Sequence, residues 1–166
     1  SNNALKAWGY NAYGQLGYGD SSYRGDGPNE MGDYLPYIDL GLGRTVVDLF
    51  VGTYSESTCA VLDNFAVKCW GRNDQQGQLG SGATSNLGND PGEMGDNLAT
   101  VSLGTSRTVV MGSSGTNHSC VLLDNGAVKC WGSNDAGQLG YGDIVNRGGS
   151  GGQMGESLPT VNVGTN

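Results

Sequence analysis

The sequence predicts an all-β fold built from repeated sheet units. The same landmarks return at a fixed period, marked by Trp8, Trp70 and Trp131, which are 62 and 61 residues apart. Glycine accounts for 31 of the 166 residues, and no window carries a sustained apolar stripe at helical spacing. The glycines occupy fixed places in each repeat, with Val, Leu, Tyr and Trp between them. This pattern favours ordered β-structure over low-complexity disorder.

Two of the repeats contain a predicted β-hairpin. The segment 58–71 returns almost unchanged as 119–132, and its second half appears again at 4–9. We expect 124–126, Asp-Asn-Gly, to form a three-residue loop in which the glycine is left-handed. Phe65 stands at the position of that glycine in the other copy, so this hairpin either bears a strain of roughly 1 kcal/mol for a bulky left-handed residue or uses another turn type.

The hairpin register predicts two disulfides. Counting down the strands from the turn places Cys120 opposite Cys130, and the same count places Cys59 opposite Cys69. Directly opposed antiparallel residues lie within disulfide range, so each pair can close without moving the backbone. Zinc is the rival ligand for paired cysteines, but the nine-residue gap within each pair and the single histidine, His118, disfavour it.

A long polar loop and a short strand are predicted to follow each hairpin. Gly-Gln-Leu-Gly occurs at 14–17, 77–80 and 137–140, and each copy precedes twelve residues rich in Gly, Asp, Asn and Ser. A Met-Gly pair then ends each loop. Alternating segments at 37–40, 100–103 and 160–163 are predicted to be strands, and 44–47 and 107–110 begin the next apolar runs.

The recurring apolar residues are predicted to fill the interfaces between sheets. We expect Trp8, Trp70 and Trp131 to pack between units. The leucines predicted beside them are Leu62, Leu79, Leu123 and Leu139, and the methionines predicted to anchor the loop exits are Met31, Met94 and Met154. Lys68 and Lys129 are expected on the solvent side of their hairpins.

The pattern at 120–140 resembles the repeat of the regulator-of-chromosome-condensation family. It has Cys-x-Leu-Leu-Asp-Asn-Gly-x-Val-Lys-Cys-Trp-Gly and then Asn-Asp-x-Gly-Gln-Leu-Gly, and the resemblance covers essentially the whole chain. It implies four-stranded antiparallel blades arranged radially as a β-propeller, commonly with about seven blades. The family includes nuclear exchange factors, ubiquitin ligases, bacterial protein inhibitors and exported proteins, so the resemblance specifies the fold better than the function.

The chain is expected to be a single repeat array, 1–166, forming a partial propeller of nearly three repeats. A ring of seven such repeats would need well over twice these residues. We expect a fragment of a longer propeller, ahead of a protomer that completes its blades with neighbouring chains and of a small closed form.

The net charge and the composition of the loops limit the classes of binding partner that we expect. A net charge of −8 disfavours nucleic acid, which requires clustered Lys and Arg. Calcium binding is one hypothesis for the acidic loops, because they are rich in oxygen ligands. Solvated polar loops are the alternative, favoured because the spacing is not that of an EF-hand and the third repeat lacks most of the carboxylates. The candidate calcium ligands are Asp20, Asp26, Glu30, Asp33, Asp90, Glu93 and Asp96.

The disulfides predict an oxidising compartment, hence a secreted (extracellular), periplasmic or cell-surface protein. Asn117-His118-Ser119 is a glycosylation sequon, although Asn117 at the start of a strand fits a packed polar position as well. No apolar run is long enough to span a bilayer and no signal peptide is visible, so we expect the processed part of an exported protein or a segment of a larger one.

The sequence predicts a non-enzymatic binding or structural module. His118, the single histidine, precedes a disulfide cysteine, and no nucleophile elbow, phosphate loop or metal cluster appears. A subunit of an extracellular filament or surface layer is the specific version, with neighbouring chains or the rest of its own propeller as partners. A soluble inhibitor or receptor-like propeller that binds one protein is the alternative. A guanine-nucleotide exchange factor would need a reduced nuclear setting and a complete ring, and the chain offers neither.

Overall fold

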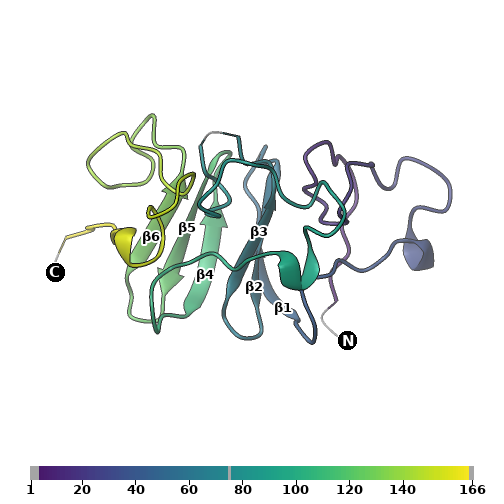
Figure 1. Cartoon of the computed structure of the whole chain (residues 1–166), viewed down its shortest axis with the longest axis horizontal. Helices are drawn as coiled ribbons and strands as arrows, with labels where there is room; N and C mark the ends of the chain where they lie inside the picture. Colours follow the sequence, from purple (N-terminus) through teal and green to yellow (C-terminus); the bar gives the residue numbers. More distant parts are fainter. Residues whose placement is uncertain (1–3, 75, 165–166) are drawn as a thin grey trace.

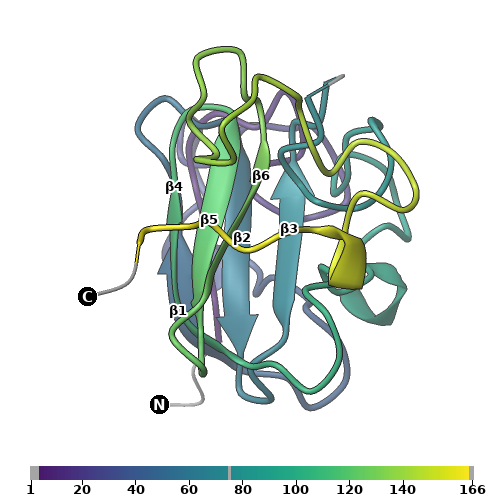
Figure 2. The same cartoon turned by 90° about the vertical axis from the view of Figure 1, so that its left-hand side faces the viewer.

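The computed structural model describes residues 4–74 and 76–164. It contains two three-stranded antiparallel sheets that stand side by side along the long axis of the molecule (Figure 1). Along that axis the sheets lie one behind the other, and β1 contacts β4 (Figure 2). The strands are β1 (Val46–Phe50), β2 (Ser57–Leu62) and β3 (Val67–Gly71), then β4 (Val109–Ser114), β5 (His118–Leu123) and β6 (Val128–Gly132). The all-β prediction is confirmed.

Helix is limited to three short turns in the described ranges. They are the 3-10 turns η1 (Gly32–Tyr34), η2 (Gly95–Asn97) and η3 (Gly155–Ser157). Each turn follows one of the loop-exit methionines, and its first glycine has a positive φ, 68° at Gly95. No helix within these residues is long and apolar enough to cross a membrane.

Both hairpins have the predicted turn and register. Gly126 adopts φ 81° and its N–H donates to the Leu123 carbonyl at 2.9 Å. Phe65 adopts φ 62° at the equivalent place, so the first hairpin uses the same turn in spite of its bulky residue. Antiparallel pairing then sets the cysteines opposite each other. The disulfides are Cys59–Cys69 and Cys120–Cys130, each with Cα atoms 4.1 Å apart.

The prediction of outer strands at 37–40, 100–103 and 160–163 is wrong, because none of these segments forms a strand. These segments are extended, but each is joined to the β3, β6 or equivalent 4–9 segment of its repeat by a single backbone hydrogen bond, such as Val161 N to Val128 O at 2.8 Å. In the third repeat the next groups along the edge are bound elsewhere, because the Tyr141 hydroxyl accepts from Cys130 N and donates to Cys130 O, at 2.8 and 2.9 Å. In this repeat the ladder therefore stops after one bond. The fourth segment is irregular in all three repeats.

The hydrophobic core lies between repeats rather than within them. One cluster joins the first repeat to the β1–β3 sheet and includes Ile38, Leu62 and Trp70. The other joins the two sheets and includes Leu79 and Trp131. Both tryptophans are fully buried, and each indole N–H donates across the interface to a Gly-Gln-Leu-Gly carbonyl of the preceding repeat. Leu79, Leu123 and Leu139 are buried as predicted.

Trp8 was expected in this core, and that prediction is wrong. Its side chain is 62% exposed, whereas Trp70 and Trp131 are 0% exposed. The two buried tryptophans are covered by the repeat that precedes them. In the described part of the chain no repeat precedes Trp8, so the same landmark lies open to solvent.

The expected solvent position of the repeated lysines is also wrong. Lys68 and Lys129 are each only 6% exposed. Lys68 Nζ donates to Leu40 O of the first repeat at 2.9 Å and to Gly95 O of the second at 2.8 Å. Burial lowers the pKa of Lys68. Each lysine ties the outer segment of one repeat to the loop exit of the next, because buried carbonyls from both need a donor.

A buried asparagine organises each long loop. Asn73 is fully buried, its Oδ1 accepts from Leu79 N at 3.0 Å, and its Nδ2 donates to Ala83 O at 2.8 Å. Asn11 and Asn134 make the equivalent bonds in the other repeats. One side chain therefore holds both ends of the loop and sets where its exposed residues stand.

Candidate protein-binding site

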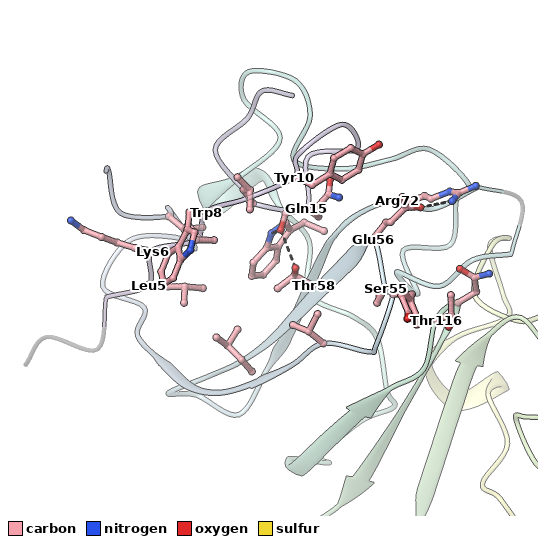
Figure 3. A pocket seen from close by; sticks show the side chains of 18 residues that line it. Leu5, Lys6, Trp8, Tyr10, Gln15, Ser55, Glu56, Thr58, Arg72 and Thr116 are labelled. Atoms are coloured by element: carbon pink, nitrogen blue, oxygen red, sulfur yellow. Dashed lines mark hydrogen bonds and ion pairs between the residues drawn. The ribbon is translucent and has the colours of Figure 1, made fainter. Parts of the chain in front are cut away.

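A groove of about 670 Å³ lies between the first repeat and the β1–β3 sheet. Figure 3 shows Leu5, Lys6 and Trp8 on one side of it and Ser55 and Glu56 at the other. Apolar side chains cover most of its walls. They are Leu5, Ala7, Trp8, Leu16, Ile38, Leu49 and Val51. A groove of this size and lining fits an extended peptide or an apolar side chain of a partner.

One wall of the groove is an extended segment, 4–9, with one unpaired main-chain edge among the described residues. Ala4–Gly9 corresponds to β3 and β6, and its outer edge is bonded: Leu5 O accepts from Ile38 N at 2.9 Å, and Ala7 N donates to the Tyr18 hydroxyl at 3.0 Å. In β3 the residues that face the other way, Lys68 and Trp70, pair with β2. The main-chain groups of Lys6 and Trp8 have no hydrogen-bond partner among the described residues.

The other end of the groove is polar. Arg72 forms an ion pair with Glu56, and this bond raises the pKa of Arg72. Its guanidinium carbon also lies 4.9 Å from the ring centroid of Tyr13. Thr58 Oγ1 donates to Gln15 O at 2.9 Å (Figure 3). The groove therefore offers an apolar wall with hydrogen-bonding groups at one end, and the charges at that end are already paired.

Exposed tyrosines surround this part of the first repeat. Six of the eight tyrosines belong to it, Tyr10, Tyr13, Tyr18, Tyr23, Tyr34 and Tyr37. The Tyr10 ring lies 5.0 Å from that of Tyr23, and both are more than two-fifths exposed. The other two repeats carry Asn at the place of Tyr23 and Thr at the place of Tyr37. Aligning the repeats reveals this enrichment, which the reasoning on landmarks missed; exposed tyrosine is typical of contact surfaces.

Most of the seven candidate calcium residues are held by other bonds, including Asp90, whose Oδ2 accepts from Asn89 Nδ2 at 3.0 Å. Glu30 Oε2 accepts from the N–H groups of Gly25, Asp26 and Gly27, which lowers the pKa of Glu30, and Glu93 makes the same bonds with 88–90. Asp20 pairs with Arg24 at 2.7 Å. Asp96 accepts from Leu42 N. Within 4–74 and 76–164 no three His, Cys, Asp or Glu side chains converge where they could hold a metal ion.

Asn117 lies at a bend directly before β5, and its residue contributes to the wall of the groove. Its main-chain carbonyl accepts from Ser133 N at 2.8 Å, so the backbone there is fixed. Burial lowers the pKa of the neighbouring His118. Glycosylation at Asn117 stays a prediction.

Comparisons with known proteins agree with these features. The family described as "Regulator of chromosome condensation (RCC1) repeat" matches residues 112–138. The human E3 ubiquitin-protein ligase HERC2 is 31% identical over 139 residues, which cover 83% of this chain and 2% of the ligase. Mouse protein RCC2 is 29% identical over 124 residues, covering 74% of this chain and 22% of that protein.

Solved propellers share the arrangement of the sheets. Human WBSCR16 matches with a TM-score of 0.59 at 21% identity, over 88% of this chain and 32% of that one. Yeast RCC1 (Prp20), solved bound to Kap60, matches with a TM-score of 0.58 at 21% identity, over 87% and 30% of the two chains. The chain thus spans about a third of the structural relatives and far less of the ligase. It belongs to the RCC1 repeat family, and its sheets are blades of the RCC1-type β-propeller fold.

Proposed function

We propose that this array is a non-enzymatic, extracellular protein-binding module that accepts an extended segment of a partner protein in the groove beside Leu5–Gly9. The unpaired main-chain edge of that extended segment, set against apolar walls, is the observation that carries the proposal. An extended partner would add a strand to the sheet, gaining main-chain hydrogen bonds along the edge and burying alternate side chains in the groove.

The second repeat supplies the template for this strand. β2 runs antiparallel to β3, with Thr58 opposite Trp70 and Ala60 opposite Lys68. A partner strand in the same register would lie with its residues opposite Trp8 and Lys6. β2 is almost completely buried and carries small or apolar side chains, so the favoured partner has the same character.

The described residues offer binding groups rather than catalytic ones. Among the described residues the single histidine, His118, has no ionisable partner within hydrogen-bond distance. The Glu30 and Glu93 carboxylates accept backbone N–H groups. The RCC1 repeat is generally a binding scaffold. We therefore assign binding alone to this array.

Both disulfides support the proposal of an extracellular location. Cys59–Cys69 and Cys120–Cys130 clip hairpins that carry core residues, and bridges of this kind persist in oxidising compartments. Secretion to the bacterial periplasm should give fully bridged protein of higher melting temperature than cytosolic protein. Equal melting temperatures for bridged and reduced protein would contradict a stabilising role for the bridges.

A subunit of an extracellular surface assembly is the second candidate function. It is favoured by the first repeat, whose Trp8 and neighbouring tyrosines lie exposed where the equivalent residues of later repeats are covered or polar.

A peptide titration tests the groove. The probe is a synthetic peptide of residues 57–62 with Cys59→Ser, and the readout is the fluorescence of exposed Trp8, with a Trp8→Phe variant as the background. Val51→Asp places a charge in the groove and should weaken binding by roughly tenfold or more. Val47→Asp is the matched control, because Val47 is equally exposed on the same chain segment but does not line the groove. Equal affinity of the two variants, or equal binding of a scrambled peptide, would refute the groove as the site.

A further inference from the structure

Two of the three repeats fasten their outer segment with a tyrosine. The Tyr18 hydroxyl donates to Ala7 O at 2.9 Å, accepts from Ala7 N at 3.0 Å and lies 3.3 Å from Pro36 O of the outer segment. In the third repeat the Tyr141 hydroxyl makes the same three contacts. They are with Cys130 N at 2.8 Å, Cys130 O at 2.9 Å and Pro159 O at 3.0 Å. One hydroxyl therefore joins the outer segment to the main-chain edge beside it.

An arginine and an aspartate hold each of these tyrosines in place. The Arg24 guanidinium carbon lies 5.1 Å from the ring centroid of Tyr18, and Arg24 pairs with Asp20 at 2.7 Å. In the third repeat Arg147 lies 4.5 Å from the equivalent ring and pairs with Asp143 at 2.7 Å. The tyrosine, the arginine and the aspartate together form a tyrosine lock.

The second repeat lacks the tyrosine lock. Ser81, Ala83 and Leu87 stand at the positions of its tyrosine, aspartate and arginine. Ser81 Oγ accepts from Asn73 Nδ2 at 3.1 Å and donates to Ala83 O at 3.3 Å, so this hydroxyl is used inside its own loop. Leu87 packs against the hydrophobic core instead. Within the described residues no side chain of this repeat takes the place of the tyrosine hydroxyl.

The outer edge of β3 is therefore left with unbonded main-chain groups. The Cα atoms of Cys59 and Cys69 are 4.1 Å apart, which is the close spacing of an antiparallel pair without mutual hydrogen bonds. The N–H and C=O of Cys69 thus point outward, as those of Cys130 do toward Tyr141. In the described part of the chain neither group of Cys69 has a partner, although Cys69 is 2% exposed. Buried main-chain groups in this state are rare, because each costs free energy.

The outer segment of the second repeat, 98–105, is termed the strap. A single main-chain bond, Val101 N to Val67 O at 2.8 Å, joins it to β3. The third repeat makes four hydrogen bonds with it. They are Lys129 Nζ to Leu103 O at 2.9 Å, Gly155 N to Ser102 O at 2.9 Å, and Thr105 N and Thr105 Oγ1 to Glu156 Oε1 at 2.5 and 2.8 Å. Hydrogen bonding therefore attaches the strap to the next repeat more than to its own.

Two hollows flank the strap. One of about 270 Å³ lies between 100–104 and the start of β3, and another of about 270 Å³ lies between the strap and the loops at 80–82 and 150–152. A hollow removes contacts that close packing would supply. The buried side chains of Leu98, Val101 and Leu103 are what oppose separation of the strap from the hairpin, together with the one main-chain bond.

We propose that the strap is a conformational device that parts from β3 as a local unit while both sheets stay folded. It stays attached to the third repeat, so the seam opens inside the second repeat and not at the boundary between repeats. The open state presents Val67 O, Cys69 N and Cys69 O to solvent along the outer edge of β3. The second repeat has a neighbouring repeat on each side within the described chain, and the strap does not line the groove.

Native-state hydrogen exchange tests the opening. The amides are followed by NMR at several urea concentrations below the unfolding transition. The Val101 amide should exchange at least about tenfold faster than the amides of the central strands β2 and β5. Its rate should depend little on urea, because a local opening exposes little surface. A Val101 amide with the rate and urea dependence of the β2 and β5 amides would overturn the proposal, since the strap would then open only with the whole fold.

Transplanting the tyrosine lock tests its role. Ser81→Tyr combined with Ala83→Asp and Leu87→Arg should slow exchange of the Val101 and Cys69 amides at least about tenfold, because the new hydroxyl binds the edge of β3. The matched control is Ser81→Phe with the same two changes, which keeps the ring without the hydroxyl and should leave the Cys69 amide as it is in the intact chain. Equal exchange in the Tyr and Phe variants would overturn the role of the lock.

Tyr141→Phe supplies a second test that needs no transplanted residues. It removes the hydroxyl bonded to Cys130 N and keeps the ring, so the Cys130 amide should exchange at least about tenfold faster, approaching the rate at Cys69. An unchanged rate at Cys130 would show that the hydroxyl does not fasten this edge and would overturn the inference. None of the substituted residues lines the groove, so the peptide titration stands or fails separately.

Discussion

The first and second repeats carry the same landmarks in opposite environments. Trp8 is 62% exposed and Trp70 is 0% exposed, although each stands before Gly in the same strand position. Lys6 donates to one carbonyl at the surface, and Lys68 donates to two while buried. The difference shows that these residues form the contact between neighbouring repeats and are not part of the interior of a single blade. Their contribution to stability depends on whether a repeat precedes them.

Tryptophan truncation should give the largest contrast. Trp70→Ala removes a fully buried side chain from the interface and should lower the free energy of unfolding by about 3–5 kcal/mol. Trp8→Ala should change it by no more than about 0.5 kcal/mol at concentrations where the chain is monomeric. Urea unfolding followed by circular dichroism measures both. A comparable loss of unfolding free energy at the two positions would show that Trp8 and Trp70 do not differ in their contribution to stability.

The lysines should give a smaller contrast of the same sign. Lys68→Met keeps the apolar length but leaves the buried carbonyls of Leu40 and Gly95 without their donor, at a cost of about 1–3 kcal/mol. Lys6→Met should stay within about 0.5 kcal/mol. Thermal unfolding at one protein concentration compares them. A neutral Lys68→Met would show that these carbonyls find other partners.

The two hairpin turns allow the second and third repeats to be compared, because they place different residues in the same left-handed conformation. Phe65 is held at φ 62° and 53% exposed, where the third repeat has Gly126. Phe65→Gly should stabilise the chain by about 1 kcal/mol, because glycine adopts this conformation without strain. Phe65→Ala, which keeps the Cβ, should not gain stability, and Gly126→Ala should lose a similar amount in urea unfolding.

The long loops should differ in their response to acid. Glu30 accepts three backbone N–H groups, whereas the third repeat uses neutral Gln153 to accept from Gly148 N and Ser150 N. The bonds from Gly27 and its neighbours lower the pKa of Glu30. The carboxylate therefore stabilises the loop above the ordinary Glu pKa of about 4.3 and loses that effect as the pH falls through the lowered value.

Amide chemical shifts between neutral pH and pH 2 measure this difference. The amides of 25–27 should titrate at a pKa below the ordinary one, and those of 148–150 should not titrate. Glu30→Gln should abolish the titration at 25–27 while keeping the loop folded. Parallel titration of both loops would point to general acid unfolding.

Local features of the fold were predictable from the sequence. The turn at 124–126 fixed the hairpin register, and the register fixed the cysteine pairs, so all the information lay within eleven residues of chain. The buried lysines were not predictable in this way, because the acceptors of Lys68 lie 27 and 28 residues away and belong to two repeats. The prediction that Trp8 is buried was wrong for a related reason, because sequence periodicity does not show which repeat is covered by a neighbour.

The candidate site was less predictable than the fold. The landmark residues define the framework, and the groove arises where one extended framework segment, 5–9, has an unpaired edge in the described structure. The tyrosines around it occupy positions that vary between repeats, so a search for what the repeats share passes over them. A search for what distinguishes the repeats would have found them.

Each covalent bridge is confined to a single hairpin, with its two cysteines ten positions apart. Oxidation of one unit therefore needs nothing from any other, and it can finish as soon as that hairpin has formed. A gene that gains or loses a whole unit leaves every remaining bridge with its proper mate. Chain length in such arrays is free to drift without the risk of scrambled cross-links.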